Sequence, residues 1–206
     1  MTVNHVEVLV EEPSMQAAMQ RLLPRLLGET TFKVYAFRCK QDLLKRLPER
    51  LWGYSKWLPS DWRILVIVDR DNDNCLELKE KMETVASDAS LVTKTQADDS
   101  ISYHVVNRVA VEELEAWYFG DWQAVRRAYP RVSESVPRRA RYRKPDEIKG
   151  GTWEAFERLL KRSGYFRNGL RKIEAARKVA KHWNPEANKS HSFQVLRKTL
   201  CDMASA

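Results

Sequence analysis

The chain has 206 residues, 43% of them hydrophobic and 31% charged, and a formal net charge of +8 at pH 7. This length suffices for one well-packed domain, or for one domain with a substantial appendage. The sequence shows neither the roughly 20-residue apolar run of a membrane-spanning helix nor a secretory signal, so we expect a cytoplasmic protein with no membrane contact. The three cysteines form no CxxC pair, which argues against a zinc site or a disulfide framework.

The net charge is divided unevenly along the chain. Residues 1–122 hold 15 Lys and Arg against 20 Asp and Glu, whereas residues 123–206 hold 21 against 8. An acidic half that could hold a metal ion thus precedes a basic half that could hold a polyanion. Such asymmetry indicates nucleic acid as a partner, although basic surfaces also arise without one.

Residues 1–122 alternate short apolar segments with amphipathic ones. The segment 63–69 is apolar on both faces, as a central parallel strand should be, and 32–38 alternates between the two faces. The intervening segments have apolar residues at helical spacing, and Pro13 suits the first turn of a helix. The pattern predicts strands at 5–11, 32–38, 63–69 and 103–109, helices at 13–27, 41–51, 75–86 and 111–122, and loops at 52–62 and 98–100.

After about residue 122 the sequence has no convincing strand. Apolar residues at helical spacing predict helices at 152–163, 170–183 and 190–203. Strands that alternate with helices, followed by helices alone, predict an α/β fold. We expect a mostly parallel, four-stranded, Rossmann-like sheet in residues 1–122, with a basic helical appendage in residues 123–206.

Acidic side chains follow three of the four predicted strands. They are Glu11 and Glu12 after the first, Asp69, Asp71 and Asp73 after the third, and Glu112, Glu113 and Glu115 after the fourth. The carboxyl ends of parallel strands lie along one edge of an open α/β sheet, where such folds place their chemistry. Carboxylates gathered there repel one another unless a cation lies between them, and Mg²⁺ and Mn²⁺ prefer oxygen ligands. We therefore expect a magnesium- or manganese-dependent active site.

Each acidic cluster also has another interpretation, and for Glu11 it is an ordinary acid of a first helical turn. The position of Asp73 favours the N-cap of the following helix over a metal ligand. The same segment has acids at the spacing of an EF-hand calcium loop, but Asn74 replaces the turn glycine and a strand precedes the loop. Phosphatases of the haloacid dehalogenase type also carry Asp-X-Asp after a strand, but Asp73 stands where they have Thr or Val. The glutamates after the fourth strand could be ordinary acids of a first helical turn, and spacing does not choose among them.

A glutamate after the first strand and an Asp-X-Asp pair after a later one resemble the TOPRIM domain. That domain is the metal-binding module of topoisomerases, primases, a ribosomal-RNA maturase and the overcoming-lysogenization-defect nucleases. Glu11 matches the family's glutamate, and Asp69 and Asp71 match its aspartate pair. The chain has Glu12 where TOPRIM domains usually have glycine.

A segment similar to Arg-Glu-Ile-Glu-Asn-Tyr of the overcoming-lysogenization-defect nucleases lies at 112–117, which implies that Glu113 and Glu115 approach the metals. Nearly the whole chain is similar to a bacterial family catalogued as a domain of unknown function (DUF 4276), which we regard as TOPRIM-like. That resemblance rests on residues 10–15, 65–71, 112–117, 150–154 and 192–195. Members of that family are suspected of acting beside ATPases in defence against phage. Because this chain has no glycine-rich phosphate loop, such an ATPase would be a separately encoded partner.

The resemblance implies a nuclease that hydrolyses DNA or RNA with Mg²⁺ or Mn²⁺. The catalytic residues would be Glu11, Asp69, Asp71, Glu115 and Lys172, and the metal ligands would be Glu11, Asp69, Asp71, Asp73, Glu113 and Glu115. Lys172, Lys189 and Arg70 are candidates for stabilising the charge of the transition state, and a solvated surface lysine is the alternative for Lys172. The alternative function is a non-catalytic TOPRIM-like subunit that binds nucleic acid or an ATPase.

The segment 138–144 has five basic residues in seven and surrounds Tyr142 with positive charge. Its basic residues are Arg138, Arg139, Arg141, Arg143 and Lys144. Such a segment binds the phosphate backbone without reading the base sequence. The alternative is a solvated loop.

Overall fold

The computed structural model describes residues 2–98 and 102–205, so most of the loop predicted at 98–100 lies outside the described residues. Four parallel strands form a single sheet in the order β2-β1-β3-β4. The strands are β1 (His5–Val10), β2 (Thr31–Ala36), β3 (Trp62–Asp69) and β4 (Val105–Ala110). The predicted α/β class with a parallel four-stranded sheet is confirmed.

The strand order creates a topological switch point between β1 and β3. From β1 the chain passes to β2 on one side of β1, and from β2 it crosses to β3 on the other side of β1. In open α/β sheets the crevice at such a point, outside the carboxyl ends of the strands, is where ligands bind. The carboxyl ends of β1 and β3 therefore lie together at the position where this fold class carries its function.

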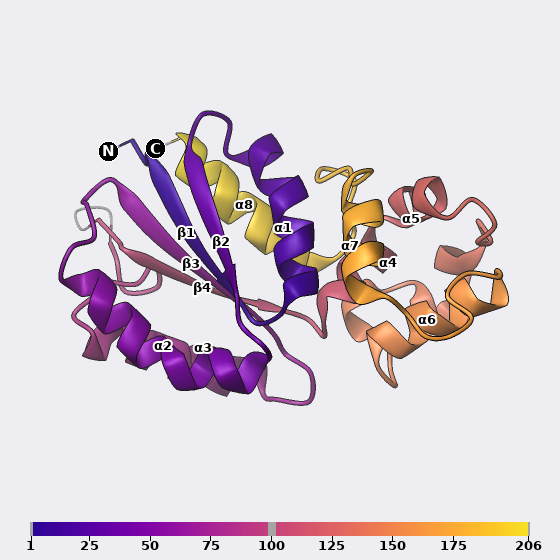
Figure 1. Cartoon of the computed structure of the whole chain (residues 1–206), viewed down its shortest axis with the longest axis horizontal. Helices are drawn as coiled ribbons and strands as arrows, with labels where there is room; N and C mark the ends of the chain where they lie inside the picture. Colours follow the sequence, from indigo (N-terminus) through magenta and orange to yellow (C-terminus); the bar gives the residue numbers. More distant parts are fainter. Residues whose placement is uncertain (1, 99–101, 206) are drawn as a thin grey trace.

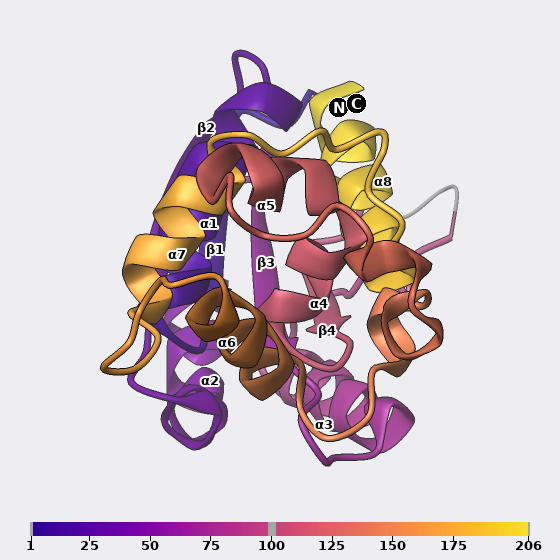
Figure 2. The same ribbon diagram turned by 90° about the vertical axis from the view of Figure 1, so that its right-hand side faces the viewer.

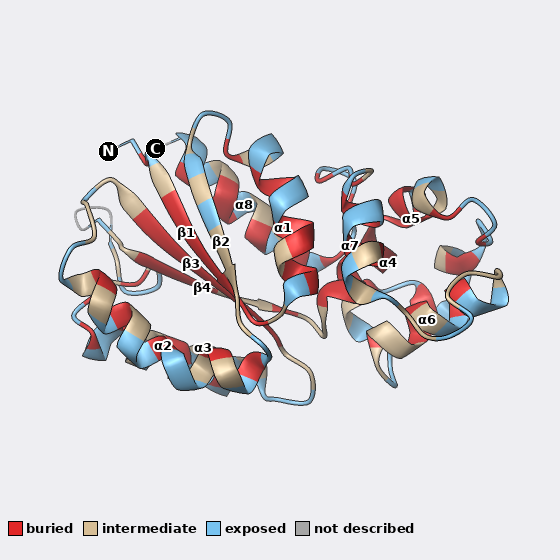
Figure 3. Ribbon diagram, in the orientation of Figure 1, coloured by how far each residue is buried: buried red, intermediate tan, exposed pale blue. Residues whose placement is uncertain are grey.

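Helices cover both faces of the sheet (Figure 1). One face packs against α1 (Pro13–Leu26) and α8 (His191–Ser205), and the other packs against α2 (Lys40–Ser55) and α3 (Cys75–Asp88). Successive strand residues point to opposite faces of the sheet. Because helices cover both faces, the side chains on both are mostly apolar. Figure 3 shows β1 and β3 buried along most of their length, whereas the edge strand β2 is only partly buried.

The remaining helices lie beyond the carboxyl ends of the strands (Figures 1 and 2). They are α4 (Leu114–Gly120), α5 (Trp122–Ala128), α6 (Thr152–Arg162) and α7 (Lys172–Ala180), with short 3₁₀ turns at Val136–Arg138, Ala140–Tyr142 and Pro145–Glu147. Buried aromatic rings hold this region together: Trp117 lies 6.3 Å from Trp183 and 5.5 Å from Phe193 between ring centroids. The helices are thus placed over the edge of the sheet where the acidic clusters were predicted.

The C-terminal part of the chain is helical, as predicted, but α8 runs back along the sheet beside α1. Asp146 accepts hydrogen bonds from the Ser190 hydroxyl at 2.6 Å and from the Ser192 amide at 2.9 Å, which satisfies donors at the start of α8. One continuous hydrophobic core joins α8 to α1 and to the helices at the sheet edge. The domain boundary at residue 122 stays a prediction.

Two predicted segments differ from the structure. The helix predicted at 41–51 continues to Ser55, so the first part of the segment 52–62 is helical. The helix predicted at 111–122 is divided into α4 and α5, because Asp121 takes a non-helical conformation and its side chain accepts a hydrogen bond from the Ala124 amide at 3.1 Å. Among the described residues, no helix has the length and apolar character to cross a membrane.

Gly120, the last residue of α4, packs closely on the loop before α8. An added Cβ would overlap Asn188 Oδ1 and lie 2.9 Å from the Ser190 backbone nitrogen. Asn188 bonds both the Trp117 carbonyl and the Ser190 amide, so it has no room to move aside. We expect Gly120→Ala to lower the free energy of unfolding in urea by about 2 kcal/mol.

Gly53, in α2, is the matched control for this substitution. No atom lies within 4 Å of a Cβ added there. Gly53→Ala should raise the free energy of unfolding by up to about 1 kcal/mol, because alanine has the higher helix propensity. Equal effects of the two substitutions would contradict the close packing at Gly120.

Candidate active site

Glu11 and Asp69 lie side by side at the switch point of the sheet. Glu11 directly follows β1, and Asp69 is the last residue of β3. The Asp69 backbone N–H donates a hydrogen bond to Glu11 Oε2 at 2.9 Å. The residues are only 7% and 4% exposed, and Asp69 Oδ1 is buried without a hydrogen-bond partner. The register of two adjacent strands thus places two carboxylates together in a poorly solvated position.

Burial shifts the titration of both groups toward the neutral form. It raises the pKa of Glu11 to about 7, with the hydrogen bond from Asp69 opposing the shift and the charge of Asp71 adding to it. Burial, followed by the negative charges of Glu11 and Glu115, raises the pKa of Asp69 well above its usual value. Without a cation, these carboxylates do not all carry their charge at neutral pH.

Glu115, in α4, is a third buried carboxylate, close enough for its charge to act on Asp69. It is 1% exposed, and its Oε2 is buried without a hydrogen-bond partner. Burial raises its pKa to about 8, against the opposing charge of Lys172. One turn later in α4, the buried Tyr118 hydroxyl also has no partner. Three buried oxygens at this edge therefore have unused bonding capacity: Asp69 Oδ1, Glu115 Oε2 and Tyr118 Oη.

Lys172, the first residue of α7, faces this acidic cluster. Its Nζ lies 3.8 Å from Glu12 Oε2 and 5.3 Å from the centroid of the Trp153 ring. Burial lowers its pKa, but the surrounding carboxylates, led by Glu115, outweigh that effect and raise the pKa above its usual value. Its side chain is 34% exposed, so the ammonium is neither fully solvated nor enclosed. Lys172 is thus placed between the carboxylates and the solvent.

Lys40 is a residue of the site that sequence reasoning missed. It is the buried first residue of α2, and its Nζ donates to Asp71 Oδ2 at 2.5 Å and lies 2.8 Å from Asp73 Oδ2. It also donates to the backbone carbonyls of Asp69 and Arg70, each at 3.1 Å. Burial lowers the pKa of Lys40, but the hydrogen bonds to the two aspartates outweigh this and raise it. The carboxyl ends of parallel strands meet at one edge of the sheet. This principle could have identified Lys40, because Lys40 follows β2 as the acids follow β1 and β3.

The structure corrects the preferred interpretation of Asp73. The N-cap of α3 is Asn74, whose Oδ1 accepts a hydrogen bond from the Leu76 amide at 3.0 Å. Asp73 instead forms its ion pair with Lys40. Asp71 adopts φ 49°, in the left-handed region that an aspartate tolerates better than most side chains do. The turn after β3 is therefore shaped around the Lys40 ammonium.

The other two glutamates of the third cluster have separate partners. Glu112 forms an ion pair with Arg70 at 2.7 Å. Arg70, one of the candidates for stabilising the transition state, is therefore already paired. Glu113 Oε2 accepts hydrogen bonds from the Thr152 hydroxyl at 2.7 Å and the Trp153 amide at 3.0 Å, at the positive end of α6. Glu113 thus joins α4 to α6, and its role as a metal ligand stays a prediction.

The basic segment 138–144 forms an exposed surface on two 3₁₀ turns. Its five cations are all exposed: Arg138, Arg139, Arg141, Arg143 and Lys144. Tyr142 anchors the segment, because it is buried and stacks on Phe119 with ring centroids 5.2 Å apart. Lys144 also pairs with Glu147 at 3.0 Å. Lys189, the remaining basic candidate, is exposed in the loop before α8.

Within residues 2–98 and 102–205, no three His, Cys, Asp or Glu side chains form a group that could hold a metal ion as they stand. The chemistry of the donors nevertheless fits a hard divalent cation, because buried carboxylate oxygens of Asp69 and Glu115 have no partner. Glu11 adds a third carboxylate with a raised pKa. A bound cation would satisfy these oxygens and offset the repulsion among the three groups.

The comparisons with known proteins identify a family. The sequence model of a family described as "Domain of unknown function (DUF4276)" matches residues 10–201. No curated protein and no solved structure was found to match the chain significantly.

Removing the Lys40 ammonium should destabilise the turn after β3. We expect Lys40→Met to lower the free energy of unfolding, measured in urea with EDTA, by about 2 kcal/mol. This is less than the loss of a fully buried pair, because Asp71 and Asp73 are partly exposed. Lys45→Met, on an exposed position of the same helix, is the control and should change stability by less than about 0.5 kcal/mol. Equal effects would refute a structural role for Lys40.

Glu115 should make the metal-free protein less stable as pH rises. Its pKa is about 8 in the folded protein against 4.5 in a solvated chain, so the folded state retains the proton that the unfolded state has lost. Its contribution is fully present below pH 4.5 and is lost as pH rises through about 8. Relative to Glu115→Gln, the wild type in EDTA should lose on the order of 2 kcal/mol between about pH 5.5 and 8.5. Urea unfolding at several pH values measures this difference.

Glu29→Gln provides the control, because Glu29 is exposed in the turn before β2. Its stability should follow that of the wild type across the same pH range. Parallel curves for wild type and Glu115→Gln would contradict the burial of a titrating carboxyl in α4.

Proposed function

Since the chain belongs to the family described as a domain of unknown function (DUF4276), whose description names no reaction, we propose its function from the site: a metal-dependent phosphodiesterase that hydrolyses DNA or RNA. The observation that carries this proposal is the pair of buried, unpartnered carboxylate oxygens, Asp69 Oδ1 and Glu115 Oε2, beside Glu11. Such an arrangement is costly to bury without a cation and favours Mg²⁺ or Mn²⁺ as its partner.

In the proposed enzyme, Glu11, Asp69 and Glu115 hold the divalent ion. When bound, the ion supplies an activated water and charge stabilisation for the phosphate oxygens. Lys40 holds the turn after β3 in place through Asp71 and the backbone carbonyls of that turn. The turn then keeps the Asp69 carboxylate fixed at the end of β3.

Lys172 has the position of a group that stabilises negative charge on the substrate. Its ammonium lies beside the carboxylates yet is one-third exposed, so it can reach a phosphate that approaches from solvent. Preorganised positive charge of this kind lowers the energy of a phosphoryl-transfer transition state. The high pKa of Lys172 keeps it charged at neutral pH.

Nucleic acid is the proposed substrate because the chain supplies a basic surface for its backbone. The segment 138–144 exposes five cations, and residues 123–206 carry an excess of 13 positive charges. Contacts of this type bind phosphates and weaken with salt, by a slope of about −0.9 per neutralised phosphate on duplex DNA. A relationship to TOPRIM nucleases, a role in defence against phage and a separately encoded ATPase partner belong to the same proposal.

A non-catalytic module that binds nucleic acid is the second candidate. The observation that favours it is Lys40, which forms ion pairs with both Asp71 and Asp73 without any metal. In that case the acids at the sheet edge would be structural. The two candidates differ in whether metal removal abolishes the activity or leaves binding unchanged.

Incubation with plasmid DNA, single-stranded DNA and RNA, in Mg²⁺, in Mn²⁺ and in EDTA, tests the proposal. We expect cleavage that depends on the metal and falls by about 100-fold or more in Asp69→Asn, which replaces the buried carboxylate by a similar-sized amide. Asp88→Asn, on the exposed end of α3, should cleave as the wild type does. Calorimetric titration with Mn²⁺ should show binding to the wild type and weaker binding to Asp69→Asn.

Two results would refute the enzyme. One is cleavage that persists in folded Asp69→Asn, because the activity would then come from elsewhere. The other is nucleic-acid binding without cleavage and without Mn²⁺ binding, which would favour the non-catalytic module.

A further inference from the structure

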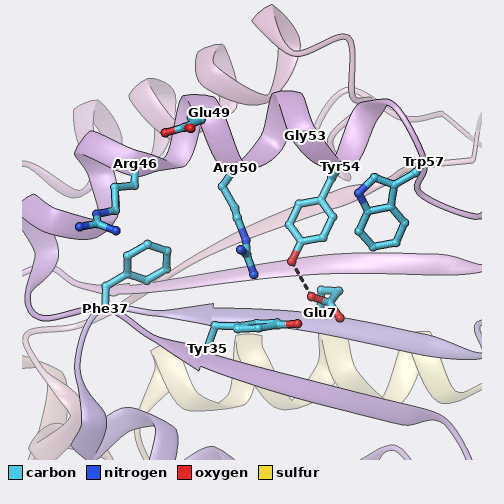
Figure 4. A pocket seen from close by; sticks show the side chains of 9 residues that line it. All are labelled: Glu7, Tyr35, Phe37, Arg46, Glu49, Arg50, Gly53, Tyr54 and Trp57. Carbon is cyan, nitrogen blue, oxygen red and sulfur yellow. Dashed lines mark hydrogen bonds between the residues drawn. The ribbon is translucent and has the colours of Figure 1, made fainter.

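A separate cavity of about 560 Å³ lies between α2 and the strands β1 and β2, on the α2 face of the sheet (Figure 4). None of the residues of the candidate active site lines it. Its volume is in the range of pockets that hold small organic ligands. The side chains that line it are of three kinds: arginines, aromatic rings and two carboxylates, of which Glu7 is buried and Glu49 is exposed.

Arg50 is the most unusual of these residues. Its guanidinium carbon lies 4.5 Å from the centroid of the Tyr35 ring and 5.3 Å from that of Tyr54. Its Nε is buried without a hydrogen-bond partner, and Arg50 forms no ion pair with any carboxylate in the described part of the chain. Arg50 also forms a side-chain hydrogen bond with Tyr54, but its buried Nε donor is unused, which is unfavourable away from water. Although Glu49 also lines the cavity, Arg50 is a cation without an ion-pair partner among the described residues, so it can bind an anionic ligand.

Arg46 extends this positive charge. It precedes Arg50 by one helical turn, so both side chains leave α2 on the same face. Arg46 donates from Nε to Asp42 at 3.1 Å, which leaves its two terminal nitrogens for another acceptor. Figure 4 shows both arginines reaching from α2 toward Phe37 and Tyr35 on the sheet. Figure 4 places Arg46 at one end of the cavity and Arg50 nearer its middle, and guanidinium groups of this kind bind phosphate.

The other end of the cavity is aromatic. Trp57 lies 5.3 Å from Tyr54 between ring centroids, and Figure 4 places the two rings next to each other on the same wall. Trp57 remains 55% exposed, which is unusual for so large an apolar side chain. An exposed indole beside a second ring is a surface on which a flat ligand ring stacks.

Glu7 lies beneath Tyr54 and supplies a fixed acceptor. It is a buried carboxylate in β1 that accepts hydrogen bonds from the Tyr54 hydroxyl at 2.5 Å and from His5 Nε2 at 3.0 Å. Each carboxylate oxygen accepts more than one hydrogen bond, so both retain capacity for a further donor. Its two protein partners hold it in one orientation toward the cavity.

We propose that this cavity binds a nucleotide. The phosphate would bind Arg46 and Arg50, the base would stack on Trp57, and an amino or ring N–H of the base would donate to Glu7. A free mononucleotide and the terminal nucleotide of a strand share this chemistry. The proposal does not rest on the hydrolysis proposed for the sheet edge, because the two sites have no residue in common.

Calorimetric titration of the full-length protein in EDTA tests the proposal. The probes are the four ribonucleoside monophosphates, inorganic phosphate and a 5′-phosphorylated oligonucleotide. At least one nucleotide should bind about 10-fold more tightly than phosphate, and Arg50→Gln should weaken that binding by about 10-fold. Trp57→Ala should weaken it too. Binding of the monophosphates identifies a site for free nucleotides. Binding of the oligonucleotide alone identifies a site for the end of a strand only where Arg50→Gln weakens it, because the segment 138–144 also binds nucleic acid in the proposed function.

Arg21→Gln, on the exposed side of α1 across the sheet, is the control and should bind as the wild type does. Thermal melting confirms that each variant is folded. Asp69→Asn should retain nucleotide binding, which separates this site from the candidate active site. Three results would overturn the proposal: no nucleotide binding at millimolar concentration, phosphate binding as tight as nucleotide binding, or binding unchanged in folded Arg50→Gln.

Discussion

The burial of three carboxylates at one edge of the sheet is the physical constraint on which the candidate site depends. Burial opposes the ionisation of Glu11, Asp69 and Glu115, and the charges of Glu11 and Glu115 add to this effect on Asp69. Removing a charged group from water costs several kcal/mol unless a partner offsets it. Lys40, which pairs with Asp71 and Asp73, and Lys172, which lies 3.8 Å from Glu12, offset part of the negative charge at this edge. The proposed cation would neutralise the negative charge that the two lysines leave.

The helices beyond the sheet contribute residues to the candidate active site. Glu115 comes from α4 and Lys172 from α7, and both helices lie over the carboxyl ends of the strands. The division of charge along the sequence therefore corresponds to an arrangement in space, because basic helices cover an acidic edge. β1 serves both proposed sites: strand alternation directs Glu7 toward α2, whereas Glu11 follows the end of the strand.

Local periodicity accounts for most of the fold that could be predicted. Each of the four strands was expected within two residues of its observed ends, because apolar runs bounded by turns are a local property of the chain. The division between α4 and α5 was not predicted, since it depends on the Asp121 side chain bonding the Ala124 amide. The return of α8 to the sheet was also not evident, because an amphipathic helix does not specify which apolar surface it covers.

The sequence by itself determined that carboxylates follow the ends of several strands, because a parallel sheet brings those ends to one edge. It also determined that basic residues follow in the helical half. Only the tertiary structure decided which acids are buried, that Asn74 rather than Asp73 caps α3, and that Lys40 binds the turn after β3. The physical reason is that hydrogen-bond partners and burial depend on residues distant in sequence, whereas periodicity records only which face of an element is apolar.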